Sequence, residues 1–292
     1  MGDFYITHRL ARRILALYGP RAPDGQDHPP DARTPVDLLA ETASVLGIDF
    51  LAALPGGAPG IGWEGPRFPE EIRFLDVSGF FVFCFVEGGF TRLCREWGLG
   101  ETLAFSTNRP GEAREMFKAV VSEAFRAADQ ALSLGCRGVM LGEDFAFERG
   151  LFLHPFLARE VLYPAFELVL NHFQAPVVLH CDGDASDVLP DIGSLGFRGF
   201  HSCEPTGKMT VKRAAEMTGG KICLIGGMAQ DALRKDAAAA ALHARDLLHQ
   251  RGRAPYVFGS SAGVLDDSLA PEAVVGAYRA ISSHLMNGPA CP

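Results

Sequence analysis

The stretch that says most about the fold of this chain is Pro176-Val-Val-Leu-His-Cys-Asp-Gly183. A short apolar run bounded by proline and glycine is typical of a buried β-strand. Side chains alternate along a strand, so His180 and Asp182 point one way from its C-terminal end and Cys181 points the other way. A histidine and a carboxylate presented together can bind a metal, relay a proton or hold a substrate. The structural alternative is a histidine that only caps a neighbouring loop.

Apolar runs of this kind recur along the chain and alternate with segments of helical periodicity. Such an alternation indicates parallel βαβ units, whose strands are covered on both faces. We therefore expect an α/β fold, a (β/α)8 TIM-type barrel with an irregular or reduced N-terminal unit. A doubly wound open sheet is the alternative, disfavoured because no G-x-G-x-x-G fingerprint follows the first strand. The expected strands cover residues 48–51, 80–86, 137–142, 177–180, 198–203, 221–225 and 255–258, with a peripheral strand over 71–77.

The length of the chain fits a single domain. A (β/α)8 barrel takes roughly 250 residues, and the chain has 292, so we expect one barrel domain over residues 1–292. Residues 1–35 are expected to form an N-terminal helix and a loop within it. The expected helices cover residues 5–18, 33–45, 90–97, 110–134, 155–173, 186–195, 208–217, 231–250 and 271–286.

Composition excludes several classes of partner. The formal net charge is −8 and the sequence pI is about 5.6, which leaves no basic footprint for nucleic acid or an anionic membrane. No apolar run reaches the ~18 residues of a membrane span, and the N-terminus has no signal-peptide pattern. The seven cysteines form no C-x-x-C pair, which fits reduced, buried thiols. We therefore expect a cytoplasmic protein.

Polar side chains gather where the expected strands end. In a parallel barrel the active site lies at the C-terminal ends of the strands, and the residues there are much more acidic than those at the opposite ends. Carboxylates crowded in a low-dielectric mouth repel one another, so they need a cation: a metal, an arginine or a charged substrate. The alternative is that strand ends are polar because loops are. Several carboxylates converging on one histidine favour an enzyme.

Roles can be assigned to these strand-end residues. Candidate metal ligands are His180 and Asp182 with one or two of Glu143, Asp144 and Glu204, since imidazole and carboxylate both suit zinc. The set that we prefer is His180, Asp182 and Glu204. The same residues could instead donate and accept protons without a metal. The candidate catalytic residues are His180, Asp182, Asp144, Glu143 and Glu204. The candidate substrate-binding residues are Glu87, Met228, Ser260 and Ser261.

One further pair lies on the strand expected over 198–203. His201 and Cys203 point the same way from it and could together bind a metal. Such a pair is more often packed against a helix, and that is the expectation here.

The motifs resemble the uroporphyrinogen decarboxylase superfamily, which contains porphyrinogen decarboxylases and corrinoid-linked methyltransferases. Each motif alone is weak, but their order and spacing together are specific, and the family fold is a (β/α)8 barrel. The motifs are Arg33-Thr-Pro-Val36, Phe85-Val-Glu-Gly-Gly-Phe90, Gly142-Glu-Asp-Phe-Ala-Phe-Glu-Arg-Gly150 with Pro155, His180-Cys-Asp-Gly183, Glu204-Pro205, Gly226-Gly227, and Gly259-Ser-Ser-Ala-Gly263 with Pro271-Glu272.

The chain departs from both branches of that family. The methyltransferase branch binds zinc through a histidine, a cysteine and a late cysteine, and these positions fall on His180, Asp182 and Ala262. A thiolate-rich zinc site is therefore not implied, and zinc held by carboxylates with His180 is the form that remains. The decarboxylase branch has an N-terminal arginine-rich segment that clamps the porphyrinogen, and the chain shows none. Ala229 and Ala273 also stand where the family pattern has aspartate and asparagine.

The resemblance implies an enzyme of methyl transfer that acts on a small methylated substrate or a methyl-corrinoid. Its cofactors would be a divalent metal such as zinc and a corrinoid supplied by a partner protein. Family members often pair, so a homodimer is also implied. The alternatives are a decarboxylase of a tetrapyrrole or a smaller acid, and a non-catalytic barrel that binds a ligand or a corrinoid.

Overall fold

The computed structural model describes residues 1–20, 33–55, 65–205 and 208–287. Most of the loop expected within residues 1–35 falls outside these ranges. No helix in the described part of the chain is both long enough and apolar enough to cross a membrane. The cysteines at 84, 94, 136, 181, 203 and 223 are free thiols, as expected.

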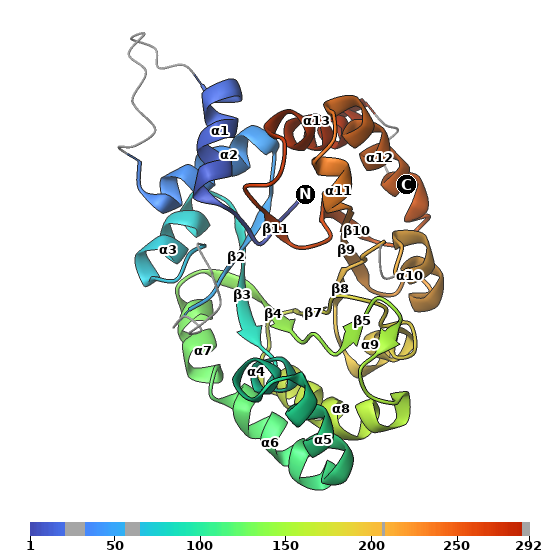
Figure 1. The fold of residues 1–292 in the computed structure, drawn as a ribbon. Helices are drawn as coiled ribbons and strands as arrows, with labels where there is room; N and C mark the ends of the chain where they lie inside the picture. The colour runs from blue at the N-terminus through green and yellow to red at the C-terminus, as the bar shows by residue number, and fades with distance from the viewer. Residues whose placement is uncertain (21–32, 56–64, 206–207, 288–292) are drawn as a thin grey trace.

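Seven parallel strands form one curled sheet ringed by helices, in the spatial order β10-β9-β8-β7-β4-β3-β2 (Figure 1). Neighbouring strands are joined through helices, so the βα alternation predicted from the sequence is confirmed, and with it the TIM-type α/β barrel. The strand predicted over residues 48–51 is present two residues further along, as β2. The strands are β2 (Phe50–Ala53), β3 (Phe81–Glu87), β4 (Cys136–Gly142), β7 (Val177–His180), β8 (Gly199–Ser202), β9 (Cys223–Met228) and β10 (Tyr256–Ser260).

The first residues of the chain lie between the two edge strands, β2 and β10. Gly2 forms a parallel bridge with Phe50 of β2, and its N–H donates to the carbonyl oxygen of Phe258 in β10 at 2.9 Å. The N–H of Ala52 donates to the carbonyl oxygen of Phe4 at 2.9 Å. Backbone groups on both edges are thereby paired, and an edge left unpaired would be a liability. The N-terminal segment therefore takes the eighth position, which is the reduced unit that the sequence predicts.

Two small two-stranded sheets flank the barrel. The strand β1 (Tyr5–Ile6) pairs in parallel with β11 (Val264–Leu265). This pairing extends the contact of the N-terminal segment to the residues that follow β10. The strands β5 (Ala146–Phe147) and β6 (Gly150–Leu151) form a hairpin after β4.

Two apolar layers fill the fold. The inner one lies within the barrel and contains Phe4, Phe50, Phe83, Met140 and Ile225. The outer one packs the opposite faces of the strands against the helices; on β3 it takes Val82, Cys84 and Val86, which alternate with the inward phenylalanines. The phenylalanine-rich run of β3 is thus core, because alternation supplies both layers from one strand.

Thirteen helices are described, and they connect or cover the strands. They are α1 (His8–Tyr18), α2 (Pro35–Leu46), α3 (Pro69–Val77), α4 (Gly89–Trp97), α5 (Leu99–Asn108), α6 (Pro110–Ser122), α7 (Phe125–Ser133), α8 (Pro155–His172), α9 (Leu189–Leu195), α10 (Val211–Thr218), α11 (Gln230–Leu233), α12 (Ala237–Gln250) and α13 (Pro271–Asn287).

The prediction of a peripheral strand over residues 71–77 is wrong, because these residues form α3. Pro69 occupies the first turn, where its missing N–H is harmless, and Glu71 accepts hydrogen bonds from the N–H groups of Arg67 and Phe68. The buried residues are Ile72 and Leu75, three apart, which is the spacing of a helix face.

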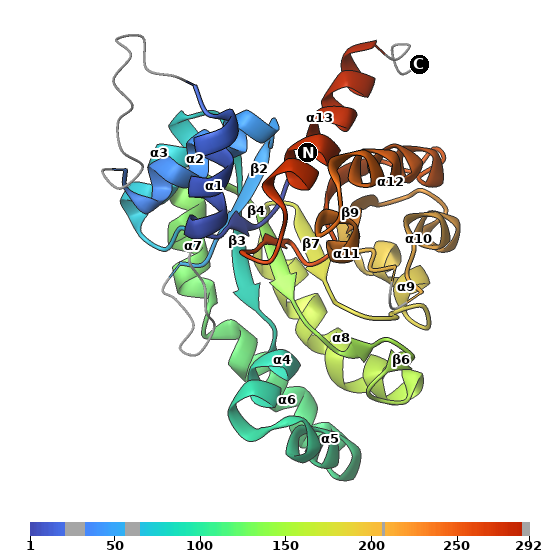
Figure 2. The same cartoon turned by 45° about the horizontal axis from the view of Figure 1, so that its top comes forward.

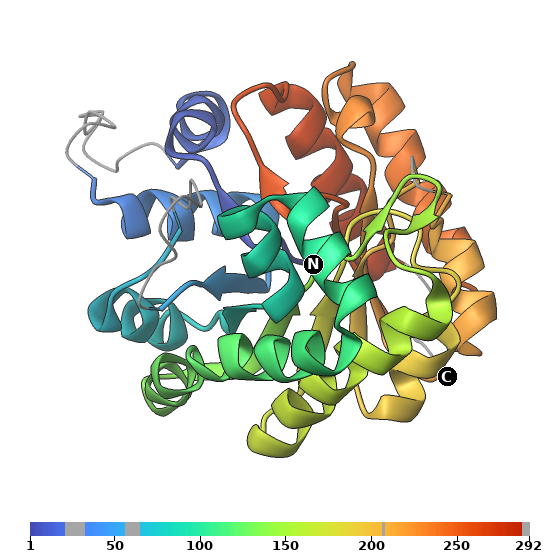
Figure 3. The same ribbon diagram turned by 60° about the horizontal axis from the view of Figure 1, so that its bottom comes forward.

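Two long predicted helices are each divided. Residues 110–134 form α6 and α7, because the N–H groups of Glu123 and Ala124 bond to carbonyls only three residues back. Residues 231–250 form α11 and α12, because the side chain of Asp236 accepts from the N–H of Ala239 and begins a new helix. The helix α5 was not predicted. With α4 and α6 it forms an arm that projects from the barrel (Figure 2), and these helices lie in front of the barrel in the view of Figure 3.

Candidate functional site

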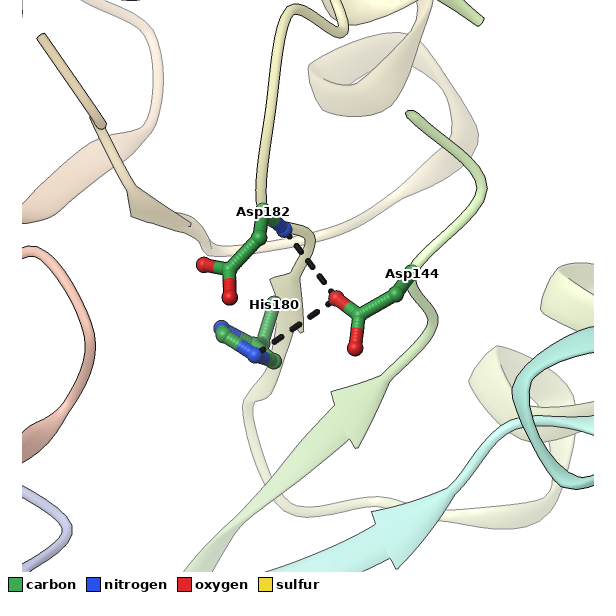
Figure 4. Close-up of side chains that lie close together, drawn as sticks. All are labelled: Asp144, His180 and Asp182. Carbon is green, nitrogen blue, oxygen red and sulfur yellow. Dashed lines mark hydrogen bonds and ion pairs between the residues drawn. The ribbon is translucent and has the colours of Figure 1, made fainter. Parts of the chain in front are cut away.

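Three polar side chains converge where β4 and β7 end. His180 is the last residue of β7, Asp182 follows it by two, and Asp144 follows the end of β4 by two. The pairing of Gly142 with His180 places these strand ends side by side. Each residue offers a ligand atom, and these atoms lie within 4.8 Å of one another (Figure 4). We refer to Asp144, His180 and Asp182 as the triad.

Backbone and side-chain contacts hold the triad together. The N–H of Asp182 donates to Oδ1 of Asp144 at 3.1 Å, and the same oxygen lies 3.7 Å from Nε2 of His180. The His180 side chain is 9% exposed, whereas that of Asp144 is 43% exposed and reaches solvent. The triad is therefore half-buried, with an open side on Asp144.

The ring of His180 is fixed from the other side by a second histidine. His201 occupies the neighbouring strand β8 in register with His180, and the two Nδ1 atoms lie 2.7 Å apart. Nε2 of His201 lies 3.2 Å from the carbonyl oxygen of Ser260. Burial, with a smaller contribution from the adjacent His180, holds the pKa of His201 well below its usual range, so this imidazole is neutral. The expectation that His201 merely packs against a helix does not describe these contacts.

Asp182 is the member of the triad whose carboxyl has a raised pKa. Burial raises the pKa of its carboxyl to about 6; His180 opposes this shift, and the charges of Asp144 and Glu204 add to it. Its Oδ1 is buried and has no hydrogen-bond partner among the described residues. A group of two carboxylates and an imidazole, in which one buried carboxylate oxygen has no hydrogen bond, fits a divalent cation that accepts nitrogen and oxygen ligands.

Glu204 lies next to the triad and follows the end of β8. Its Oε2 accepts from the N–H of Gly183 at 3.3 Å, on the loop that also carries Asp182. Of the carboxylates predicted to complete the ligand set, Asp144 is thus the one that the structure groups with His180 and Asp182, whereas Glu204, the preferred third ligand, lies beside them.

Glu143 turns away from this group and caps a helix. Its Oε1 accepts from the N–H of Phe90 at 2.9 Å and its Oε2 from that of Thr91 at 3.4 Å, at the start of α4. Burial raises the pKa of this carboxyl to about 8, although the two N–H groups oppose the shift. A Cβ on Gly88 would lie 1.5 Å from Oε2, so the cap depends on glycine there. The side chain of Glu143 therefore caps α4, and Glu143 meets His180 only through the backbone, where its N–H donates to the carbonyl oxygen of His180 at 2.9 Å.

Glu87 has an arginine partner. Its carboxylate accepts two hydrogen bonds from Arg95 of α4, at 3.0 and 2.8 Å. Both residues line a cavity of about 550 Å³ between the end of β3 and helices α4 and α7. Glu87 thus faces this cavity, and any substrate that it binds must compete with Arg95.

The predicted residues on β9 and β10 lie side by side and are buried. Ser260 pairs in register with Met228, and the N–H of Ser261 donates to the carbonyl oxygen of Met228 at 2.9 Å. The N–H and the hydroxyl of Ser260 both donate to Oδ1 of Asp3. The hydroxyl of Ser260 is therefore already engaged within the fold.

Sequence reasoning missed Asp3 and discounted His201. Burial raises the pKa of Asp3 to about 7, against the two hydrogen bonds from Ser260. The signal for His201 was present, because it lies one residue before the end of β8, the strand next to the one that His180 ends. No comparable signal pointed to Asp3, whose partner lies 257 residues away.

Three comparisons with known proteins bear on this site. The model of the family described as uroporphyrinogen decarboxylase (URO-D) matches residues 78–277. No curated protein matches the sequence. A methyltransferase from Methanosarcina mazei has a similar structure, with a TM-score of 0.73, 15% identity, and coverage of 98% of this chain and 94% of that one. A B12-independent methionine synthase from Shewanella sp. W3-18-1, in complex with selenomethionine, has a TM-score of 0.54 and 12% identity over 84% of this chain and 85% of that one. At these identities the structural likeness is one of fold.

Proposed function

Because the chain belongs to the uroporphyrinogen decarboxylase family, we propose that it is an enzyme that transfers a methyl group between a methyl-corrinoid and a small acceptor. The observation that carries the proposal is the triad, in which one imidazole faces two carboxylates at the C-terminal ends of the strands. The fold shared with the methyltransferase from Methanosarcina mazei supports it.

The triad is suited to a cation and poorly suited to an anionic substrate. His180, Asp144 and Asp182 would hold a divalent metal such as zinc through Nε2 and carboxylate oxygens, and Asp182 has an unpartnered oxygen for that purpose. When bound, the metal would act as a Lewis acid that stabilises the deprotonated form of a thiol acceptor. A decarboxylase of a tetrapyrrole would instead need cationic side chains at this position to hold the substrate's carboxylates.

The residues around the triad have separate tasks in this proposal. The acceptor thiol loses its proton and takes the methyl group, while the corrinoid keeps the electron pair of the cobalt–carbon bond as cob(I)alamin. Glu204 is the neighbouring carboxylate that we assign to take up the proton, since it accepts a hydrogen bond from Gly183 on the loop that carries Asp182. Glu87, Met228, Ser260 and Ser261 remain our candidates for contacts with the substrate.

Anaerobic incubation of zinc-loaded protein with methylcobalamin and a panel of thiols tests this proposal. We expect the absorption of methylcobalamin to be replaced by that of cob(I)alamin in step with thioether formation. His180→Ala should abolish the transfer, whereas His172→Ala, which changes a surface histidine paired with Asp129, should leave it unchanged.

Other results of this experiment would contradict the proposed function or favour a different one. Full activity in the His180→Ala variant would overturn the assigned roles. Loss of carboxylates from uroporphyrinogen, with no methyl transfer, would favour the decarboxylase. Tight corrinoid binding without turnover of either substrate would favour a binding barrel.

We also propose that residues 1–292 form one barrel domain in the cytoplasm. The N-terminal segment completes the barrel between β2 and β10, so it cannot be a separate unit. The six described cysteines are unpaired, which fits a reducing compartment.

A further inference from the structure

The contact between His180 and His201 constrains where their protons lie. The two Nδ1 atoms are 2.7 Å apart, so exactly one of the pair carries a proton between them: two N–H groups would repel and two lone pairs would not bind. The proton therefore belongs either to His180 or to His201.

The protonation of the other ring nitrogen of His201, Nε2, follows from its hydrogen-bond partner. Nε2 lies 3.2 Å from the carbonyl oxygen of Ser260, and a carbonyl can only accept, so Nε2 carries a proton. If Nδ1 of His201 were protonated as well, the ring would be a cation. His201 is 1% exposed, its ring lies 4.6 Å from that of Phe4, and its nitrogens face a histidine and a carbonyl, so neither faces a carboxylate. A buried cation in such surroundings is strongly disfavoured, and the shared proton belongs to Nδ1 of His180.

We propose that His201 is a positioning residue that keeps the shared proton on Nδ1 of His180, so that Nε2, the nitrogen that faces Asp144 and Asp182, provides the lone pair when a divalent cation binds there. This inference rests on the proposed function in one respect: the lone pair is what a divalent cation at the triad would require. Histidines that bind metals commonly donate their second N–H to an outer partner, which sets the ring orientation and tautomer. Here the outer partner is a second imidazole.

The support for this arrangement extends to the N-terminal segment. Asp3 accepts hydrogen bonds from both the N–H and the hydroxyl of Ser260, the residue whose carbonyl receives the proton of His201. Ser260 and His201 are 1% exposed, so water does not compete for these contacts. The tautomer of His180 is thus held by a chain of buried groups from Asp3 through Ser260 and His201.

Two substitutions at His201 separate its hydrogen-bonding role from its bulk. His201→Asn keeps an oxygen acceptor near the position of Nδ1, whereas His201→Leu keeps apolar volume and removes the acceptor. His172→Leu, on the surface of α8, is the matched control. The first readout is nitrogen-15 NMR of the imidazoles in metal-free protein at neutral pH, with His180 assigned by comparison with His180→Ala. The second is zinc affinity, measured by competition with a chelator.

We expect His180 in the wild type to show a protonated Nδ1. The His201→Leu variant should lose this preference and bind zinc about 10–100-fold more weakly, the range found when such an outer partner is removed. The His201→Asn variant should keep the wild-type tautomer and an affinity close to the wild-type value, and the His172→Leu variant should change neither readout.

An unprotonated Nδ1 on His180 in the wild-type protein would overturn the inference, even if no variant folded. An unchanged tautomer in a folded His201→Leu variant would overturn it as well. If the tautomer shifts as expected but the wild-type protein binds no zinc, the positioning role of His201 stands and the metal part of the proposed function fails.

Discussion

The N–H of Gly2 donates to the carbonyl oxygen of Phe258 at 2.9 Å, and this contact joins the first residues of the chain to the last strand of the barrel. The approach is close because β10 carries glycine at the next position. A Cβ on Gly259 would lie 2.0 Å from the carbonyl oxygen of Gly2. Closure of the barrel therefore depends on glycine at both position 2 and position 259.

Gly259→Ala should destabilise the protein by about 2–3 kcal/mol, because the added methyl group must displace the N-terminal backbone. The measurement is urea unfolding followed by circular dichroism. Gly111→Ala is the control: its Cβ would meet nothing within 4 Å, and alanine in a helix is favoured over glycine by roughly 0.5–1 kcal/mol. Equal stability of the two variants would contradict the closure of the barrel by Gly2.

Asp3 should make stability fall as pH rises toward neutrality. Its folded pKa is about 7, whereas that of an aspartate in an unfolded chain is about 4. Below about pH 4 both states hold the proton. Between about pH 4 and 7 only the folded state holds the proton. The free energy of unfolding therefore falls as pH rises, by on the order of 4 kcal/mol over that span. Above pH 7 this contribution changes no further.

Asp3→Asn removes the titrating group and keeps Oδ1 as acceptor for Ser260. Unfolding free energies from pH 4.5 to 8 should therefore fall less steeply for this variant than for the wild type. Parallel curves for the two proteins would show that the Asp3 carboxyl is not buried as described.

Glu143→Ala should destabilise the protein by about 2–3 kcal/mol, because it removes the acceptor of two buried N–H groups at the start of α4. Glu143→Gln keeps one acceptor and should lose less. Methyl transfer per folded molecule should be the same in Glu143→Gln and the wild type. A stable Glu143→Gln variant without activity would instead support the catalytic role predicted from the sequence.

Asp182→Asn should weaken zinc binding by roughly 100-fold or more, since it removes a charged oxygen from the triad. Without metal, the same variant should be at least as stable as the wild type above pH 6. Burial raises the pKa of Asp182 to about 6, so the ionised carboxylate is the unfavourable form in the folded state. Chelator competition and thermal unfolding in EDTA measure the two effects, with the exposed Asp231→Asn as control.

The order of the strands and the residues at their C-terminal ends followed from the sequence alone. A run such as Val177–Leu179 is apolar throughout and bounded by Pro176 and Gly183, and that pattern depends only on neighbouring residues. Because parallel strands end at one rim of a barrel, the meeting of His180 and Asp182 with Asp144 could be predicted without coordinates. Glu143 shows the limit of predicting a site from strand ends. It is next to Asp144 in sequence, but its side chain caps the start of α4 and does not join the triad.

The remaining features depend on contacts between segments that are distant in sequence. Gly2 and Asp3 complete the barrel through partners on β10, more than 250 residues away. Glu143 finds its N–H donors 53 and 52 residues before it, and His201 meets His180 only because β7 and β8 pair in one register. Local patterns determine where a strand begins and ends. Register, closure and the direction in which a buried polar side chain turns are decided by packing, because only the assembled fold shows which donors and acceptors water no longer reaches.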